Sequence, residues 1–228
     1  MKLVLAIAML VVSANPFLRA QTPRTDPDIE QIVAEISADS IRTTIEMLAN
    51  FGTRHTLSDT LSTTGGIGAA RRWIHGEFER YAMGSVGRLS ATFHETMVEP
   101  SRRVRRSANI VNVVATLSPA AGRTPSDDRV FIVAGHYDSR ASDVMDSVSA
   151  APGADDDGSG TAVVLELARV MSKYEFNATI IFLCFAGEEQ GLLGSAAWAE
   201  MAGKKGMGIE AVLSNDIVGG LQGGNGET

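Results

Sequence analysis

The chain has 228 residues, 44% hydrophobic and 21% charged, which is enough apolar material to bury one sizeable core. Its formal net charge of −7 argues against nucleic-acid binding, because non-specific binding needs a basic surface. The basic run RRVRR (102–106) favours a solvated loop before a strand, with a docking patch or a processing site as the alternative. Cys184 is the only cysteine, so no intrachain disulfide can form, and its apolar surroundings favour a buried, inert thiol.

The N-terminus is typical of a secretory signal peptide. Lys2 precedes ten apolar residues (3–12), and a small-residue cleavage site follows at Ala20. An apolar run of this length is too short to cross a bilayer. We therefore expect residues 1–20 to be removed, leaving a secreted or periplasmic protein with no stable membrane anchor.

The remaining elements are predicted in chain order from hydrophobic periodicity. After a flexible N-terminus (21–28), helical spacing over 28–50 predicts two helices, the second capped by Asp39 or Ser40. Further helices are predicted at 68–81, 161–174 and 192–201, and strands at 89–98, 107–117, 129–134, 178–186 and 209–213. Because strands alternate with helices in the second half, we expect one α/β domain over 29–228. It should be a three-layer α/β/α fold with a central mixed, mostly parallel sheet.

Four polar clusters lie in the second half of the chain. They are GHYDS (135–139), GADDDGSG (153–160), GEEQG (187–191) and SND (214–216). Three of them follow predicted strands and the other precedes a predicted helix, so all four are expected at one edge of the sheet, where α/β proteins place their chemistry. Imidazole and carboxylate groups that converge from separate elements can form a hydrolytic metal centre.

The first two clusters combine a histidine with several acids. His136 directly follows a buried strand, and Asp138 is placed to accept the second ring N–H and fix the ring's orientation. A helix cap accounts for one acid in the run 155–157, whereas a cation between the three explains their mutual proximity. A lone calcium ion is the alternative, although the spacing is not that of a calcium-binding helix–loop–helix.

The last two clusters add further carboxylates. Glu188 and Glu189 diverge at the end of a strand, so one can bind metal while the other acts as general base on water. Asp216 follows the last predicted strand. The residues alone do not choose between Glu188 and Glu189, or between the three acids at 155–157.

In this order and spacing, the motifs resemble those of metallopeptidase family 28, the co-catalytic di-zinc aminopeptidases of the bacterial leucyl aminopeptidase type. The similarity runs from His136 to Asp216 and extends back to the segments 51–55 and 108–115. Its most specific parts are the motifs GADDDGSG and GEEQGLLGS. The resemblance implies a secreted zinc aminopeptidase with a zinc-exopeptidase (phosphorylase/hydrolase-like) fold that acts on peptide substrates.

The resemblance also implies a role for each site residue. Asp156 bridges two zinc ions, and its peptide bond to Asp157 is expected to be cis. Glu188 is the general base, and Asp138 orients His136. The implied zinc ligands are His136, Asp156, Glu189 and Asp216.

The chain departs from the family at one ligand. The family has a further histidine downstream of Asp216, whereas the four histidines here are at positions 55, 75, 94 and 136. The family domain also continues past the point where this chain stops, at Thr228. We therefore expect a fragment, incomplete at its C-terminus, in which the second zinc lacks one ligand.

Two other functions remain open. Within the same fold, a carboxypeptidase or a glutaminyl cyclase-like enzyme is the alternative, although three acids and a Glu pair favour a two-metal peptidase over a single-zinc cyclase. From another class, a catalytically inactive peptidase-like domain would bind a ligand or protein partner. The presence of every motif carboxylate argues against that interpretation.

Overall fold

The computed structural model describes residues 26–120 and 128–220, and the predicted signal peptide lies outside these ranges. Within them, no helix combines the length and apolar character needed to cross a membrane. The elements in chain order are α1 (Pro27–Ala34), α2 (Ala38–Asn50), α3 (Gly66–Ala82), β1 (Leu89–Val98), β2 (Ala108–Leu117), β3 (Arg129–His136), α4 (Gly158–Met171), β4 (Thr179–Phe185), α5 (Leu193–Lys204) and β5 (Gly208–Ser214).

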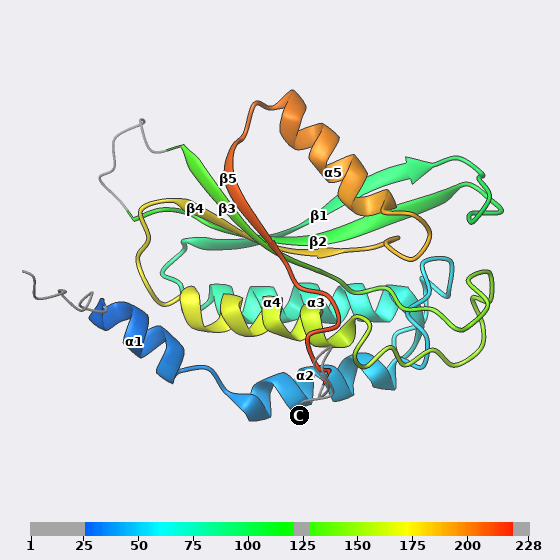
Figure 1. Ribbon diagram of the computed structural model, residues 1–228, viewed down its shortest axis with the longest axis horizontal. Coiled ribbons are helices and arrows are strands. Elements are labelled where there is room, and N and C mark those ends of the chain that lie inside the picture. The colour runs from blue at the N-terminus through cyan, green and yellow to red at the C-terminus, as the bar shows by residue number, and fades with distance from the viewer. Residues whose placement is uncertain (1–25, 121–127, 221–228) are drawn as a thin grey trace, which may run out of the picture.

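One mixed sheet organises the described residues, with strand order β1-β2-β4-β3-β5. Strand β2 runs antiparallel to β1 and β4, whereas β3 runs parallel to β4 and β5. Figure 1 shows α5 on one face of the sheet and α2, α3 and α4 on the other. The predicted three-layer α/β/α fold is confirmed. Within this sheet of the described residues, parallel pairing is confined to β3, β4 and β5, so the sheet is mixed rather than mostly parallel.

The two faces of the central strand β4 belong to different cores. Phe182 and Cys184 pack into the larger hydrophobic cluster, with residues of α2, α3 and α4. Leu183 belongs to the smaller cluster, with Trp198 of α5. This alternation is the period-two pattern of a strand covered on both faces. Burial also raises the pKa of the Cys184 thiol, as expected for an inert cysteine.

The first two helices begin earlier than the sequence predicts. The Ser37 hydroxyl accepts the Ser40 N–H at 3.2 Å, so Ser37 caps α2 and the predicted caps Asp39 and Ser40 are wrong. Helix α1 begins at Pro27, so the end of the stretch predicted to be flexible (21–28) is helical. Proline suits the first turn of a helix because its missing N–H has no partner there.

Helix α4 begins at Gly158 rather than at residue 161, because Asp157 caps it. One Asp157 oxygen accepts the Gly160 N–H at 2.8 Å. The first turn then comes close to other backbone, since a Cβ on Gly160 would lie 2.3 Å from the carbonyl oxygen of Asn215. A glycine is therefore needed where α4 meets the segment that carries Asp216.

Replacement of Gly160 by alanine tests this close approach. We expect Gly160→Ala to lower the free energy of unfolding by about 1–3 kcal/mol, because the nearest atom is a backbone oxygen and the next two belong to the Asp157 carboxylate, which two hydrogen bonds hold in place. The matched control is Gly203→Ala in α5, where a Cβ would meet nothing within 4 Å. It should raise stability by up to about 1 kcal/mol. Urea denaturation measures both, and equal effects would contradict the packing argument.

Candidate metal centre

The four polar clusters meet at one edge of the sheet, as predicted. His136 is the last residue of β3, Glu188 follows β4 and Asp216 follows β5. These three strands are parallel, so their carboxyl ends lie side by side. The acidic run 155–157 reaches the same edge from the start of α4, next to the end of β5 (Figure 1).

Three carboxylates surround the Nε2 atom of His136. The distances from Nε2 are 3.2 Å to Asp156 Oδ1, 3.7 Å to Asp216 Oδ1 and 4.0 Å to Glu188 Oε2. The His136 side chain is only 5% exposed, whereas the Asp156 and Asp216 side chains are about half exposed. One imidazole facing several carboxylates at the mouth of a site is a donor set that suits a divalent cation.

The structure distinguishes the two acids Asp156 and Asp157, which the sequence alone does not. Ligand atoms of His136, Asp157 and Asp216 lie within 4.8 Å of one another, which by distance alone favours Asp157. However, the two Asp157 oxygens already accept the backbone N–H groups of His136 (2.9 Å) and Gly160 (2.8 Å). Asp157 therefore anchors β3 to α4, and Asp156 remains free to bind a cation. Their shared peptide bond is cis, as expected.

Glu189, another predicted ligand, pairs with an arginine through one of its two oxygens. Its Oε2 atom pairs with the Arg140 guanidinium at 3.0 Å. Its Oε1 atom is buried and has no hydrogen-bond partner among the described residues. Leaving a carboxylate oxygen buried and unpartnered is costly. The carboxylate predicted to bind metal thus has one oxygen available for a further positive partner.

Asp138 connects three separate segments of the site. Its buried carboxylate accepts the Thr56 hydroxyl at 2.9 Å and the backbone N–H groups of Glu188 and Glu189 at 3.2 and 3.3 Å. The His136 Nδ1 atom lies 3.6 Å from this carboxylate and 3.1 Å from the Asp138 carbonyl oxygen. The nearer acceptor for the ring is therefore the Asp138 backbone, while the carboxylate positions the Glu pair.

A buried arginine holds the loops behind the centre. Arg54 is fully buried, and its guanidinium donates to four backbone carbonyls, those of Leu48, Tyr137, Pro152 and Gly153. Burial lowers the pKa of Arg54 to about 10, against the opposing effect of nearby carboxylates, chiefly Asp138. The side chain therefore stays cationic at neutral pH, next to the acidic cluster.

The segment that carries Asp216 is fixed on both sides. On one side, the Asn215 N–H donates to the carbonyl of Ala134 in β3 at 2.8 Å. On the other, Asp155 Oδ1 accepts the Gly219 N–H at 2.9 Å. Asp155 therefore holds this segment, and the three consecutive acids have three different roles in the structure.

The other histidines of the chain have contacts elsewhere. His55 is buried, with Nδ1 accepting the Leu57 N–H and Nε2 3.0 Å from the carbonyl oxygen of Val144. His75 stacks on Phe93, and His94 contacts Asn112. None of the three touches the carboxylates around His136 in the described ranges.

The acidic surroundings shift the protonation of the central groups. Burial alone would lower the pKa of His136, but Asp138 and other nearby carboxylates outweigh it and raise the pKa to about 10. Burial, then Asp156 and Asp138, raises the pKa of Glu189 to about 7. Burial also raises the pKa of Glu188. The pKa values of all three groups are raised, and neighbouring carboxylates contribute to each rise.

Sequence reasoning missed three residues of the site, namely Arg54, Thr56 and Arg140. Arg54 lies in a segment (51–55) that the family resemblance includes without giving it a role. An arginine in a polar, loop-like stretch has no local signal of burial, because its partners are carbonyls up to 99 positions away. Arg140 sits two residues after Asp138 in a loop, where a solvated side chain is the default expectation.

The chain belongs to peptidase family M28, whose model matches residues 112–225. A probable zinc metalloprotease of Leptosphaeria maculans is 44% identical over 205 residues, covering 90% of this chain and 47% of that protein. Leucine aminopeptidase 1 of Coccidioides posadasii is 32% identical over 202 residues, covering 86% of this chain and 47% of that protein. The chain thus spans about half the length of these relatives.

Solved structures confirm the fold. The LapA aminopeptidase of Legionella pneumophila has a TM-score of 0.61 at 23% identity, covering 83% of this chain and 45% of that one. The glutaminyl cyclase of Fimbriiglobus ruber has a TM-score of 0.59 at 22% identity, covering 79% and 61% respectively. Because these two similar structures carry different activities in their names, the fold alone does not decide the reaction.

Replacement of Arg54 tests its structural role. We expect Arg54→Met to lower the free energy of unfolding by about 3 kcal/mol or more, because it leaves several carbonyls without donors. The exposed residue Arg42 provides the control, and Arg42→Met should change stability by less than about 0.5 kcal/mol. Urea denaturation measures both. A loss for Arg54→Met no larger than the control would show that the buried contacts are dispensable.

Proposed function

We propose that this chain carries the catalytic centre of a zinc-dependent exopeptidase that hydrolyses the N-terminal peptide bond of peptides. The observation that carries this proposal is the convergence of Asp156, Asp216 and Glu188 on one ring nitrogen of His136, at 3.2, 3.7 and 4.0 Å. Membership of peptidase family M28 supports the reaction class, and the names of the zinc metalloprotease relatives support the metal.

The residues present fit a zinc site. Imidazole and carboxylate oxygens are ordinary zinc ligands, and the buried, unpartnered Oε1 of Glu189 gives a cation an additional oxygen. The ligands that we propose for up to two zinc ions are His136, Asp156, Glu189 and Asp216. When bound, zinc supplies Lewis acidity to the substrate carbonyl and makes water easier to deprotonate.

Glu188 is the proposed general base. Its backbone N–H is held by Asp138, which fixes the residue at the end of β4, and its carboxylate faces the same space as Asp156 and Asp216. Its raised pKa brings the carboxylate closer to the range in which a base both exists deprotonated and binds a proton strongly. Glu188 would take a proton from the attacking water and deliver it to the leaving amine.

The aminopeptidase type is favoured over the alternatives by one relative. Leucine aminopeptidase 1 of Coccidioides posadasii shares 32% identity with this chain. A glutaminyl cyclase remains the second candidate, because such an enzyme shares the fold. Release of a free amino acid from an unblocked peptide distinguishes the two, since a cyclase would release ammonia from an N-terminal glutamine instead.

We also propose that the protein acts outside the cytoplasm on peptide substrates. The support is the run of apolar residues after Lys2 and the cleavage site at Ala20. N-terminal sequencing of the exported protein tests this, and an intact Met1 in the mature protein would contradict it.

The Glu188→Gln variant tests the base. We expect it to keep its zinc but lose about two to four orders of magnitude in kcat, because the amide accepts no proton. The exposed residue Glu175, before β4 at the opposite end of that strand, provides the control, and Glu175→Gln should retain full activity. Hydrolysis of leucine p-nitroanilide and zinc content measure the two effects. Near-normal turnover of Glu188→Gln would eliminate this role.

The two neighbouring acids are expected to respond differently to substitution. Asp156→Asn should lose bound zinc while changing the stability of the metal-free protein little, because its side chain is 48% exposed. Asp157→Asn should lower the stability of the metal-free protein by about 1–2 kcal/mol, because an amide has one acceptor oxygen for the two backbone N–H groups that the Asp157 carboxylate accepts. Metal analysis and urea denaturation in EDTA separate the two. Normal zinc content in Asp156→Asn would show that the ligand is wrongly assigned.

A further inference from the structure

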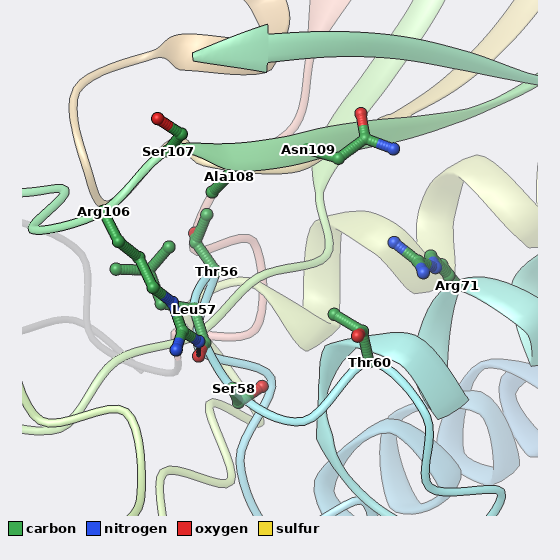
Figure 2. Close-up of a pocket in the computed structure, with 9 residues that line it drawn as sticks. All are labelled: Thr56, Leu57, Ser58, Thr60, Arg71, Arg106, Ser107, Ala108 and Asn109. Atoms are coloured by element: carbon green, nitrogen blue, oxygen red, sulfur yellow. Dashed lines mark hydrogen bonds between the residues drawn. The ribbon is translucent and has the colours of Figure 1, made fainter. Parts of the chain in front are cut away.

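A polar hollow of about 300 Å³ lies between α3, the start of β2 and the loop that precedes α3 (Figure 2). Its lining contains two arginines and no acid, although the whole chain has a net charge of −7. Two guanidinium groups and several small polar side chains around a space of this size suit a small anionic group. The lining residues that matter here are Thr56, Leu57, Arg71, Arg106 and Asn109.

The two arginines hold their charges without an acidic partner. Figure 2 shows that Arg71 extends from α3 on one side of the hollow, and that Arg106 lies on the other side, beside Leu57. Within the described ranges, the guanidinium of the half-buried Arg71 has no hydrogen-bond or ion-pair partner. Arg106 makes one long hydrogen bond, of 3.4 Å, to the Leu57 carbonyl. Both therefore have N–H groups free to bind a ligand.

An acid in a neighbouring hollow is already engaged. Glu95 lines that hollow together with Arg71, and it accepts the side-chain N–H of Asn109 at 2.6 Å. By contrast, Arg72, the neighbour of Arg71, donates to the backbone carbonyls of Thr60 and Ser62. Arg71 thus differs from the arginine beside it, because no acceptor for its guanidinium lies among residues 26–120 and 128–220.

The hollow adjoins the metal centre through shared residues. Thr56 lines the hollow, and its hydroxyl donates to Asp138, whose carboxylate also holds the Glu188 N–H. In addition, Arg103, from the same basic run as Arg106, donates to the Glu189 carbonyl at 3.0 Å. A peptide with one end at the metal centre would therefore have a hollow lined by two arginines next to it.

We propose that this hollow is a subsite for a carboxylate of the substrate, bound by Arg71 and Arg106. The inference rests on the proposed function, because it extends the same peptide site beyond the cleaved bond. The carboxylate belongs either to an acidic side chain or to the C-terminus of a short peptide. Guanidinium groups bind both kinds of carboxylate through strong, charge-assisted hydrogen bonds. The chain thereby prefers short or acidic peptides.

Four dipeptides separate the two sources of the carboxylate. Gly-Glu carries both carboxylates, Gly-Glu-amide only the side-chain one, Gly-Gln only the terminal one, and Gly-Gln-amide neither. Binding is measured by calorimetric titration in EDTA, which prevents turnover. We expect peptides with the recognised carboxylate to bind about ten- to a hundredfold more tightly than Gly-Gln-amide. Equal affinity for all four would overturn the subsite.

Variants locate the binding. Arg71→Gln and Arg106→Gln should each remove most of the preference for the carboxylate. Arg71→Gln should keep its fold, because the Arg71 side chain has no hydrogen-bond or ion-pair partner in the part of the chain that the structure describes. The matched control is Arg105→Gln, which removes the same charge from the same basic run but does not line the hollow. If Arg105→Gln lost the preference for the carboxylate equally, the basic run would attract the peptide's negative charge diffusely, and the subsite would be overturned.

Failure of the carboxylate subsite can be told apart from failure of the proposed peptidase activity. Hydrolysis of leucine p-nitroanilide, which has no carboxylate, is measured separately with zinc-loaded protein. Arg71-dependent binding without hydrolysis would support the subsite and contradict the peptidase. Hydrolysis combined with equal affinity for the four dipeptides would support the peptidase and overturn the subsite.

Discussion

The metal centre depends on one buried carboxylate, that of Asp138. It receives the Thr56 hydroxyl and the backbone N–H groups of Glu188 and Glu189, so a single charge joins segments far apart in the chain. A buried carboxylate is tolerated only when its oxygens are hydrogen-bonded. The buried guanidinium of Arg54 adds a compensating positive charge while fixing four carbonyls of the surrounding loops. The hydrogen bonds of Asp138 and Arg54 therefore both position the acids of the site and balance part of their charge.

Much of the site could be predicted because strand ends are visible in a sequence. An apolar run followed by a polar residue indicates a buried strand and its edge, and this placed His136, Glu188 and Asp216 correctly. The same local patterns do not tell which of several adjacent acids faces the metal site and which binds backbone N–H groups. Asp155, Asp156 and Asp157 differ only in their partners, which are N–H groups brought there by β3, α4 and the segment after β5.

The remaining errors and omissions come from long-range contacts. The alternation of strands and helices extends over β3, α4, β4, α5 and β5, and these strands are indeed parallel to one another in the sheet. The two strands before them, β1 and β2, are joined by a short loop and pair antiparallel, which the alternation pattern did not cover. Arg54 and Arg140 were missed for the same reason, since their partners lie in other segments of the chain.

The anchoring of Asp216 has a consequence for the order of events during folding. Strand β5 pairs only with β3 in the described residues, although 79 positions separate their first residues, Arg129 and Gly208. Pairing over such a distance is entropically slow and follows the more local contacts. We therefore expect a newly made chain to complete its acidic cluster late, when β5 joins the other strands of the sheet. Under the proposed function, the capacity to cut would arise only once the chain is itself folded and protected from cleavage.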